Sequence, residues 1–184
     1  EDESFMRSNT YKIDASLKNS TTSSVADWMR AAYASNKLAL PLLREPQLNS
    51  LFAEHAPNLQ IEFVDDNDMI GTPQWESDNI RINSDNPTAY TLPSMTLFEG
   101  RKLLQLNYVF WFSGRKPNAL IDLYSGRVDS VIWRVTLDED GQVLLYDSIH
   151  SCGCYHKYFI ASDSINVKSQ PTSREPANIF KLDA

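Results

Sequence analysis

The sequence has few of the residues on which the common phosphate-binding and nucleophile motifs depend. It contains six glycines in 184 residues, and they form no Gly-x-Gly-x-x-Gly fingerprint, no Gly-Lys-Ser/Thr phosphate loop and no Gly-x-Ser-x-Gly elbow. These motifs need glycine because only a residue without a side chain lets the backbone approach a phosphate or turn sharply at a nucleophile. Nucleotide-driven chemistry and α/β-hydrolase chemistry are therefore disfavoured.

Positive charge and long apolar runs are also scarce. The chain carries 17 basic and 24 acidic residues, a formal charge of −7 and a pI near 4.9. Such a surface argues against nucleic-acid binding, which needs a basic face. The longest uncharged apolar stretch, residues 106–112, is far shorter than the ~20 residues that span a bilayer. We therefore expect no nucleic-acid partner and no transmembrane segment in this chain.

The length and the 42% hydrophobic content indicate a globular chain with a core of its own. Residues 1–24 are polar and end in a Ser/Thr-rich stretch, so we expect a flexible lead-in that leads to a helix N-cap. Residues 25–184 are expected to form one domain. The chain begins at Glu1 without an initiator Met, which is typical of a processed mature protein or of a piece of a longer one.

Hydrophobic periodicity predicts helices early in the chain and strands later. Apolar residues recur at helical spacing over 25–38, and a second helix is expected to open at Pro46 and to stop before Pro57. From residue 59 the pattern changes to period two, and a long central strand is expected over 103–113.

The clearest structural signal is an antiparallel hairpin. Two strand patterns, 131–137 and 142–149, flank the turn sequence Asp-Glu-Asp-Gly. Residues 88–100 are ambiguous, because Pro93 weakens both a helix and a strand. Together with the early helices, these patterns predict an α+β fold in which N-terminal helices pack on a mainly antiparallel β-sheet.

A cluster of metal-ligating residue types follows this hairpin. Residues 150–156 contain both cysteines and two of the three histidines. Thiolate and imidazole are the preferred ligands of zinc. On a straight strand, alternate side chains would point to one face about 6.6 Å apart, too far to meet at one ion, but a positive φ at Gly153 would bend the chain. We therefore predict a metal site, with zinc as the default ion, held by Cys152, Cys154 and one or both of His150 and His156.

Other interpretations of this cluster stay open. A neighbouring imidazolium stabilises a thiolate, so either cysteine can serve as a nucleophile or as half of a Cys-Gly-Cys redox pair, whose disulfide would be strained and easily reduced. The four side chains can also be ordinary partly buried residues at a tight strand end. If metal is bound, three ligands leave a position for water and allow hydrolysis, whereas a fourth protein ligand makes the site structural.

A second set of charged residues surrounds the hairpin. It comprises Asp122, Arg127, Asp129, Arg134 and Asp147. If the two predicted strands pair, Arg134 and Thr136 share one face and Asp147 lies within reach of Arg134 or of the loop at 122–129. Such residues either hold the hairpin together as an ion-pair network or clamp the carboxylate or phosphate of a substrate, to which a planar guanidinium is suited.

Two classes of function follow from these observations. The first is a metal-binding domain with a structural or hydrolytic role. The second is a non-catalytic interaction module, such as the soluble part of an envelope protein, because the charge is acidic and no complete catalytic set is visible. The missing initiator Met and the Ser/Thr-rich start favour the periplasm or the cell surface, with the cytoplasm as the alternative.

Overall fold

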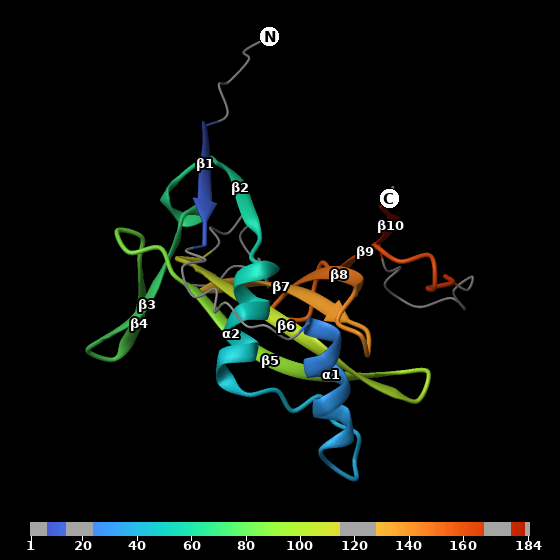
Figure 1. The fold of residues 1–184 in the computed structure, drawn as a ribbon. Helices are drawn as coiled ribbons and strands as arrows, with labels where there is room; N and C mark the ends of the chain where they lie inside the picture. The colour runs from blue at the N-terminus through green and yellow to red at the C-terminus, as the bar shows by residue number, and fades with distance from the viewer. Residues whose placement is uncertain (1–6, 14–23, 115–127, 168–177, 183–184) are drawn as a thin grey trace.

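The computed structural model describes residues 7–13, 24–114, 128–167 and 178–182 (Figure 1). Within these residues, the helices are α1 (Val25–Ala34) and α2 (Glu45–Glu54), and a short 3-10 helix covers Asp66–Asp68. The strands are β1 (Arg7–Lys12), β2 (Asn58–Phe63), β3 (Ile70–Glu76), β4 (Asn79–Asn83), β5 (Ala89–Phe98), β6 (Arg101–Phe112), β7 (Asp129–Leu137), β8 (Val143–His150), β9 (Lys157–Ile160) and β10 (Asn178–Lys181).

One large mixed sheet dominates the structure. Its eight strands run in the order β10-β9-β8-β7-β6-β3-β4, and β5 pairs with β6. The contact between β10 and β9 is parallel, and the other neighbours are antiparallel. The long strand β6 pairs with both β5 and β7 along most of its length, so it forms the centre of the sheet, as its apolar sequence predicted.

The predicted α+β fold, with N-terminal helices packed on a mainly antiparallel sheet, is wrong. The chain is mostly β, its large sheet is mixed, and the two α-helices of the described part have ten residues each. Several strands lie where the periodicity of the sequence is weak. Among the strands that the structure describes, β5 pairs with β6 alone, and Pro93 is accommodated because a strand with one neighbour tolerates a residue that lacks an N–H.

Other predicted elements are confirmed. Helix α1 begins after Ser24, whose side chain accepts a hydrogen bond from the backbone N–H of Asp27 at 3.2 Å. Strands β7 and β8 form the expected antiparallel hairpin, closed by a hydrogen bond from the N–H of Asp138 to the carbonyl of Gln142 at 2.8 Å. The change to period two at residue 59 corresponds to β2.

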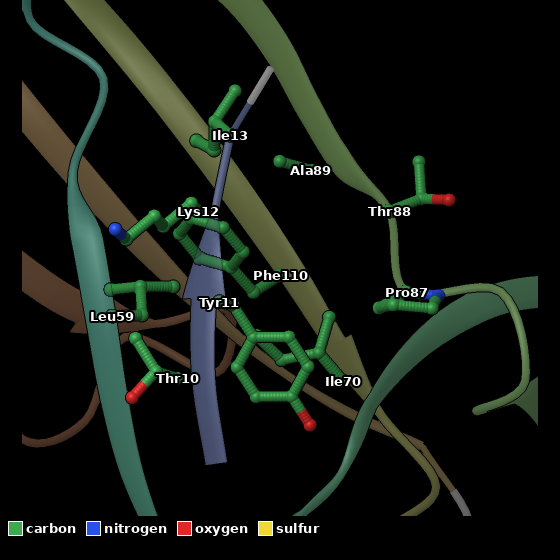
Figure 2. Close-up of a pocket in the computed structure, with 10 residues that line it drawn as sticks. All are labelled: Thr10, Tyr11, Lys12, Ile13, Leu59, Ile70, Pro87, Thr88, Ala89 and Phe110. Carbon is green, nitrogen blue, oxygen red and sulfur yellow. The ribbon is translucent and has the colours of Figure 1, made fainter.

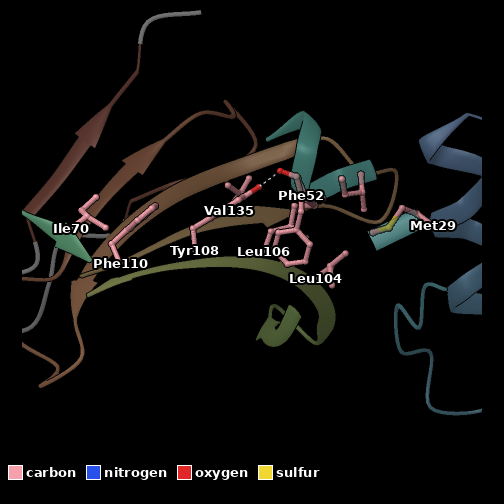
Figure 3. Close-up of a cluster of buried hydrophobic side chains, with 10 residues drawn as sticks. Met29, Phe52, Ile70, Leu104, Leu106, Tyr108, Phe110 and Val135 are labelled. Atoms are coloured by element: carbon pink, nitrogen blue, oxygen red, sulfur yellow. Dashed lines mark hydrogen bonds between the residues drawn. The ribbon is translucent and has the colours of Figure 1, made fainter. Parts of the chain in front are cut away.

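The hydrophobic core lies on one face of the large sheet, beneath the helices (Figure 3). Alternate residues of the central strands point into it, and the helices add Met29, Leu51 and Phe52. Tyr108 is fully buried there, and its hydroxyl donates to the carbonyl oxygen of Phe52 at 2.7 Å. Burial raises the pKa of Tyr108, so the phenol stays protonated and keeps this hydrogen bond. The opposite face of the sheet carries Gln105, Asn107, Arg134, Thr136 and Asp147, and we call it the polar face.

Strands β1 and β2 pair antiparallel with each other and form a separate two-stranded sheet, which we call the ribbon. Strand β1 lies within the segment expected to be a flexible lead-in. Between the ribbon and the large sheet is a cavity of about 550 Å³ (Figure 2). Tyr11 lines it from β1, Ile70 from β3 and Phe110 from β6, so its wall is continuous with the hydrophobic core.

Candidate functional site

The Cys/His cluster forms the turn between β8 and β9. The carbonyl of His150 accepts a hydrogen bond from the N–H of Gly153 at 2.8 Å, and the N–H of His150 donates to the carbonyl of Cys154 at 3.1 Å. Gly153 has a φ of +86° and Tyr155 one of +56°, so two residues in the left-handed region reverse the chain. Cys152 is exposed, Cys154 is half-buried, and no disulfide joins them.

The two histidines of this cluster lie on opposite faces of the sheet. Nε2 of His156 is 3.0 Å from Oδ1 of Asp147, on the polar face. Nδ1 of His150 is 3.1 Å from Oδ2 of Asp129, on the face that carries the core. Positions 147 and 150 of one strand point to opposite sides, which explains the separation. Among the described residues, no group of three or more His, Cys, Asp and Glu side chains could hold a metal ion.

The structure does bring together Arg134 and Asp147, which lie directly opposite each other on β7 and β8. Nε of Arg134 donates to Oδ1 of Asp147 at 2.8 Å, and Nη2 donates to the same oxygen. Asp147 is only 1% exposed, so its carboxylate depends on these protein donors in place of water.

His156 and Tyr158 complete this arrangement. The hydroxyl of Tyr158 is 3.1 Å from Nδ1 of His156, and the two rings stack with centroids 4.0 Å apart. Burial raises the pKa of Tyr158, the charge of Asp147 adds to this effect, and the charge of Arg134 opposes it. The protonated phenol of Tyr158 and Nδ1 of His156 share this hydrogen bond, and Nε2 of His156 faces both Oδ1 of Asp147 and, at 3.2 Å, Nη2 of Arg134. We call these four residues the Asp147 cluster: Arg134, Asp147, His156 and Tyr158.

A cavity of about 320 Å³ opens beside the Asp147 cluster. Arg134, Asp147 and Tyr158 are among its lining residues. Other lining residues are polar (Thr96, Gln105 and Thr136) or apolar (Leu97, Phe98, Leu103, Leu144, Leu145 and Ile165). An apolar wall with a few converging polar groups is the usual character of a small-molecule site.

The remaining charged residues of the predicted set lie apart from this cavity. Asp129 contacts His150, and it also accepts from the N–H of Ser130 at 2.7 Å. Both Asp129 and His150 line a different cavity, of about 310 Å³. Asp122 and Arg127 lie outside the described residues. The predicted set therefore does not form one network across the parts of the chain that the structure describes.

Sequence reasoning missed Tyr158 and the place of His156 beside Asp147. The signal that could have found them is the length of the turn. If β8 ends at His150 and the chain reverses over the next six residues, the returning strand places Tyr158 opposite Asp147. Neither a straight strand, on which both histidines share one face, nor a bend at Gly153 was enough to place His156 beside Asp147 from the sequence.

No family model, curated protein or solved structure matches the chain. The function is therefore argued from the side chains themselves. Among the described residues, no helix has both the length and the apolar character needed to cross a membrane.

Proposed function

We propose that this protein binds a small polar organic molecule in the cavity beside Asp147. The observation that carries this proposal is the convergence of Arg134, Asp147 and Tyr158, from three adjacent strands, on the wall of one cavity. Each of these side chains is held by its neighbours, so their binding groups are ordered before a ligand arrives. An ion pair that only joined two strands would need no cavity next to it.

The charges of the cluster favour an uncharged ligand. The opposite charges of Arg134 and Asp147 cancel. The cluster then offers the hydroxyl of Tyr158 and the guanidinium as donors and the carboxylate as an acceptor. A ligand anion would lie close to the carboxylate of Asp147 and would be repelled by it. The site is therefore suited to hydroxyl or amide groups attached to an apolar body.

Ligand-observed NMR tests this proposal. The probes are a panel of neutral monosaccharides, short-chain carboxylates and phosphate monoesters at millimolar concentration. We expect at least one class to bind and Tyr158→Phe to weaken it by about threefold to tenfold, because the variant removes one hydrogen bond and keeps the ring. Arg134→Lys should weaken binding further, since it loses the planar fork of donors.

The matched control is Tyr155→Phe, which removes the hydroxyl of a half-exposed tyrosine in the nearby turn. This variant should bind as the wild type does. If no member of the panel binds, or if binding is the same in Tyr158→Phe, Arg134→Lys and the wild type, the cavity beside Asp147 is not the site.

We propose metal binding by the β8–β9 turn as a second function. The observation that favours it is the φ of +86° at Gly153, between Cys152 and Cys154, which no disulfide joins. A bend at this residue is what two thiolates one residue apart need to approach one ion. The described residues do not bring three such ligands together, so the proposed site requires the turn to rearrange around the ion. Because the histidines lie on opposite faces, it would use both thiolates and either His150 or His156, with zinc as the default ion. A remaining position would be open to water and to hydrolytic chemistry.

Thiol labelling tests the metal site. Protein purified without a His tag is loaded with zinc and treated with an alkylating reagent at neutral pH. We expect Cys152 and Cys154 to react slowly until a chelator is added, because coordination shields both thiolates. The Cys152→Ser/Cys154→Ser variant should take up less than about a tenth of an equivalent of zinc. Rapid alkylation of the zinc-treated wild type would instead favour thiol chemistry.

A further inference from the structure

The Asp147 cluster belongs to a longer row of polar side chains that crosses the sheet. Asn107, Arg134, Asp147 and Tyr158 lie directly opposite one another on β6, β7, β8 and β9. A parallel row beside it begins on β5 and crosses to β7. We call the two rows together the polar ladder, and its members are Ser94, Gln105, Asn107, Arg134, Thr136, Asp147 and Tyr158. It therefore extends over five adjacent strands.

Hydrogen bonds connect the second row from strand to strand. The hydroxyl of Ser94 donates to Oε1 of Gln105 at 3.2 Å, and Nε2 of Gln105 donates to Oγ1 of Thr136 at 3.1 Å. Nδ2 of Asn107 also donates to the hydroxyl oxygen of Ser94, at 2.9 Å. Asn107, Thr136 and Asp147 are all buried. A sheet face that served only the packing of the fold would carry apolar side chains at such positions. A departure from this rule on three adjacent strands, β6, β7 and β8, favours a binding role for this face.

Apolar residues border the polar ladder. On one side Tyr90, Val109, Ile132 and Ile149 form a row in register, and the ring of Tyr90 is exposed, with 39% of its surface accessible. On the other side are apolar residues that line the cavity, such as Leu103. The partly exposed members of the ladder, which are Ser94, Gln105, Arg134 and Tyr158, therefore present hydrogen-bonding groups between two apolar bands, and the buried members hold them in place.

We infer that the polar face binds an elongated, uncharged polyhydroxyl ligand, an oligosaccharide, that lies across β5 to β9. This inference rests on the proposed function and names its ligand class. Five strands at a spacing of about 4.8 Å cover about 19 Å, which is longer than one sugar ring needs. Sugars join hydroxyl groups to apolar ring faces, and this combination matches a polar band between apolar bands. The cancelling charges of Arg134 and Asp147 favour such a neutral ligand over an anion.

An array of neutral glycans of one to six units tests this inference, with calorimetric titration of each glycan that binds. We expect the dissociation constant to fall at least about tenfold from one unit to the longest chains, because each added unit reaches further side chains of the ladder. Ser94→Ala, at the β5 end, should weaken the long glycans severalfold and leave the single sugar unchanged. Tyr158→Phe should weaken both. The matched control, Ser148→Ala, alters a serine that points to the other face of β8 and should change neither.

The outcomes separate this inference from the proposed function. If carboxylates or phosphate esters bind and depend on Tyr158 while no glycan binds, the cavity is a ligand site and the oligosaccharide inference is wrong. If glycans bind without any dependence on chain length or on Ser94, the ligand is small and does not lie along the ladder. If nothing on the array or in the small-molecule panel binds, both proposals are wrong.

Discussion

Asp147→Ala is expected to lower the free energy of unfolding by about 3 kcal/mol. The variant removes the acceptor to which Nε and Nη2 of Arg134 donate and which contacts His156. The side chain of Arg134 is only 23% exposed, and in the variant its guanidinium no longer has that carboxylate as a partner. We use the low end of the range for broken buried ion pairs because Arg134 still reaches some water. Urea unfolding followed by tryptophan fluorescence measures the change, as a lower midpoint with an unchanged slope.

Two further variants show where this loss comes from. Arg134→Met/Asp147→Leu removes both charges and should be less destabilised than Asp147→Ala, because no buried charge is left without its partner. Asp85→Ala, at an exposed aspartate, should stay within about 0.5 kcal/mol of the wild type. A loss below about 1 kcal/mol for Asp147→Ala would contradict the description of this carboxylate as the buried centre of the cluster.

Tyr108→Ala is expected to cost about 3 to 5 kcal/mol, the largest effect we predict for a single substitution. The ring is fully buried, and its edge packs against Phe52 with centroids 5.4 Å apart (Figure 3). The variant opens a cavity between α2 and the sheet and also removes the hydrogen bond to the carbonyl of Phe52. Chemical unfolding again provides the measurement.

Tyr108→Phe separates the hydrogen bond from the packing. It keeps the ring and leaves the carbonyl of Phe52 without this donor, so we expect a loss of about 1 to 2 kcal/mol. Tyr90→Ala, on the opposite face of the sheet and half-exposed, is the matched control and should cost much less than Tyr108→Ala. Equal losses for the two alanine variants would mean that α2 is not held to the sheet through Tyr108.

The β7–β8 hairpin could be predicted because it depends on neighbours in the sequence. Alternation of apolar residues defines the two strands, and the turn at Asp138 sets their approximate register. A register shift of one residue between Thr136 and Leu137 is also needed before Arg134 lies opposite Asp147, and the sequence pattern does not predict this shift.

The rest of the site depends on a turn that the sequence does not specify. Gly153 was expected to take a positive φ, and it does. Tyr155 also has a positive φ, which is rare for a residue with a bulky side chain, and no local pattern predicts it. The two positive φ values occur in the turn that precedes β9, where Tyr158 lies opposite Asp147 and next to His156.

The fold class was missed because the pairings that decide it are not local. Strand β10 has four residues and lies parallel to β9. Parallel neighbours cannot be joined by a tight turn, so no local turn signal predicts this pairing. Strand β1 pairs with β2 across both helices. Short strands that pair over such separations carry little periodicity of their own, whereas the two helices have clear caps and spacing.

The ribbon of β1 and β2 has a kinetic consequence. Its backbone hydrogen bonds join two strands to each other and not to the large sheet, and an isolated pair of strands is barely stable in water. The stability of the ribbon therefore depends on side chains, such as Tyr11 and Leu59, that pack against the core. The ribbon can therefore separate from the sheet as one cooperative unit while β6 and β7 stay intact. Each such opening exposes the wall at Phe110 to solvent for a short time. The free energy needed for this opening is well below the free energy of complete unfolding.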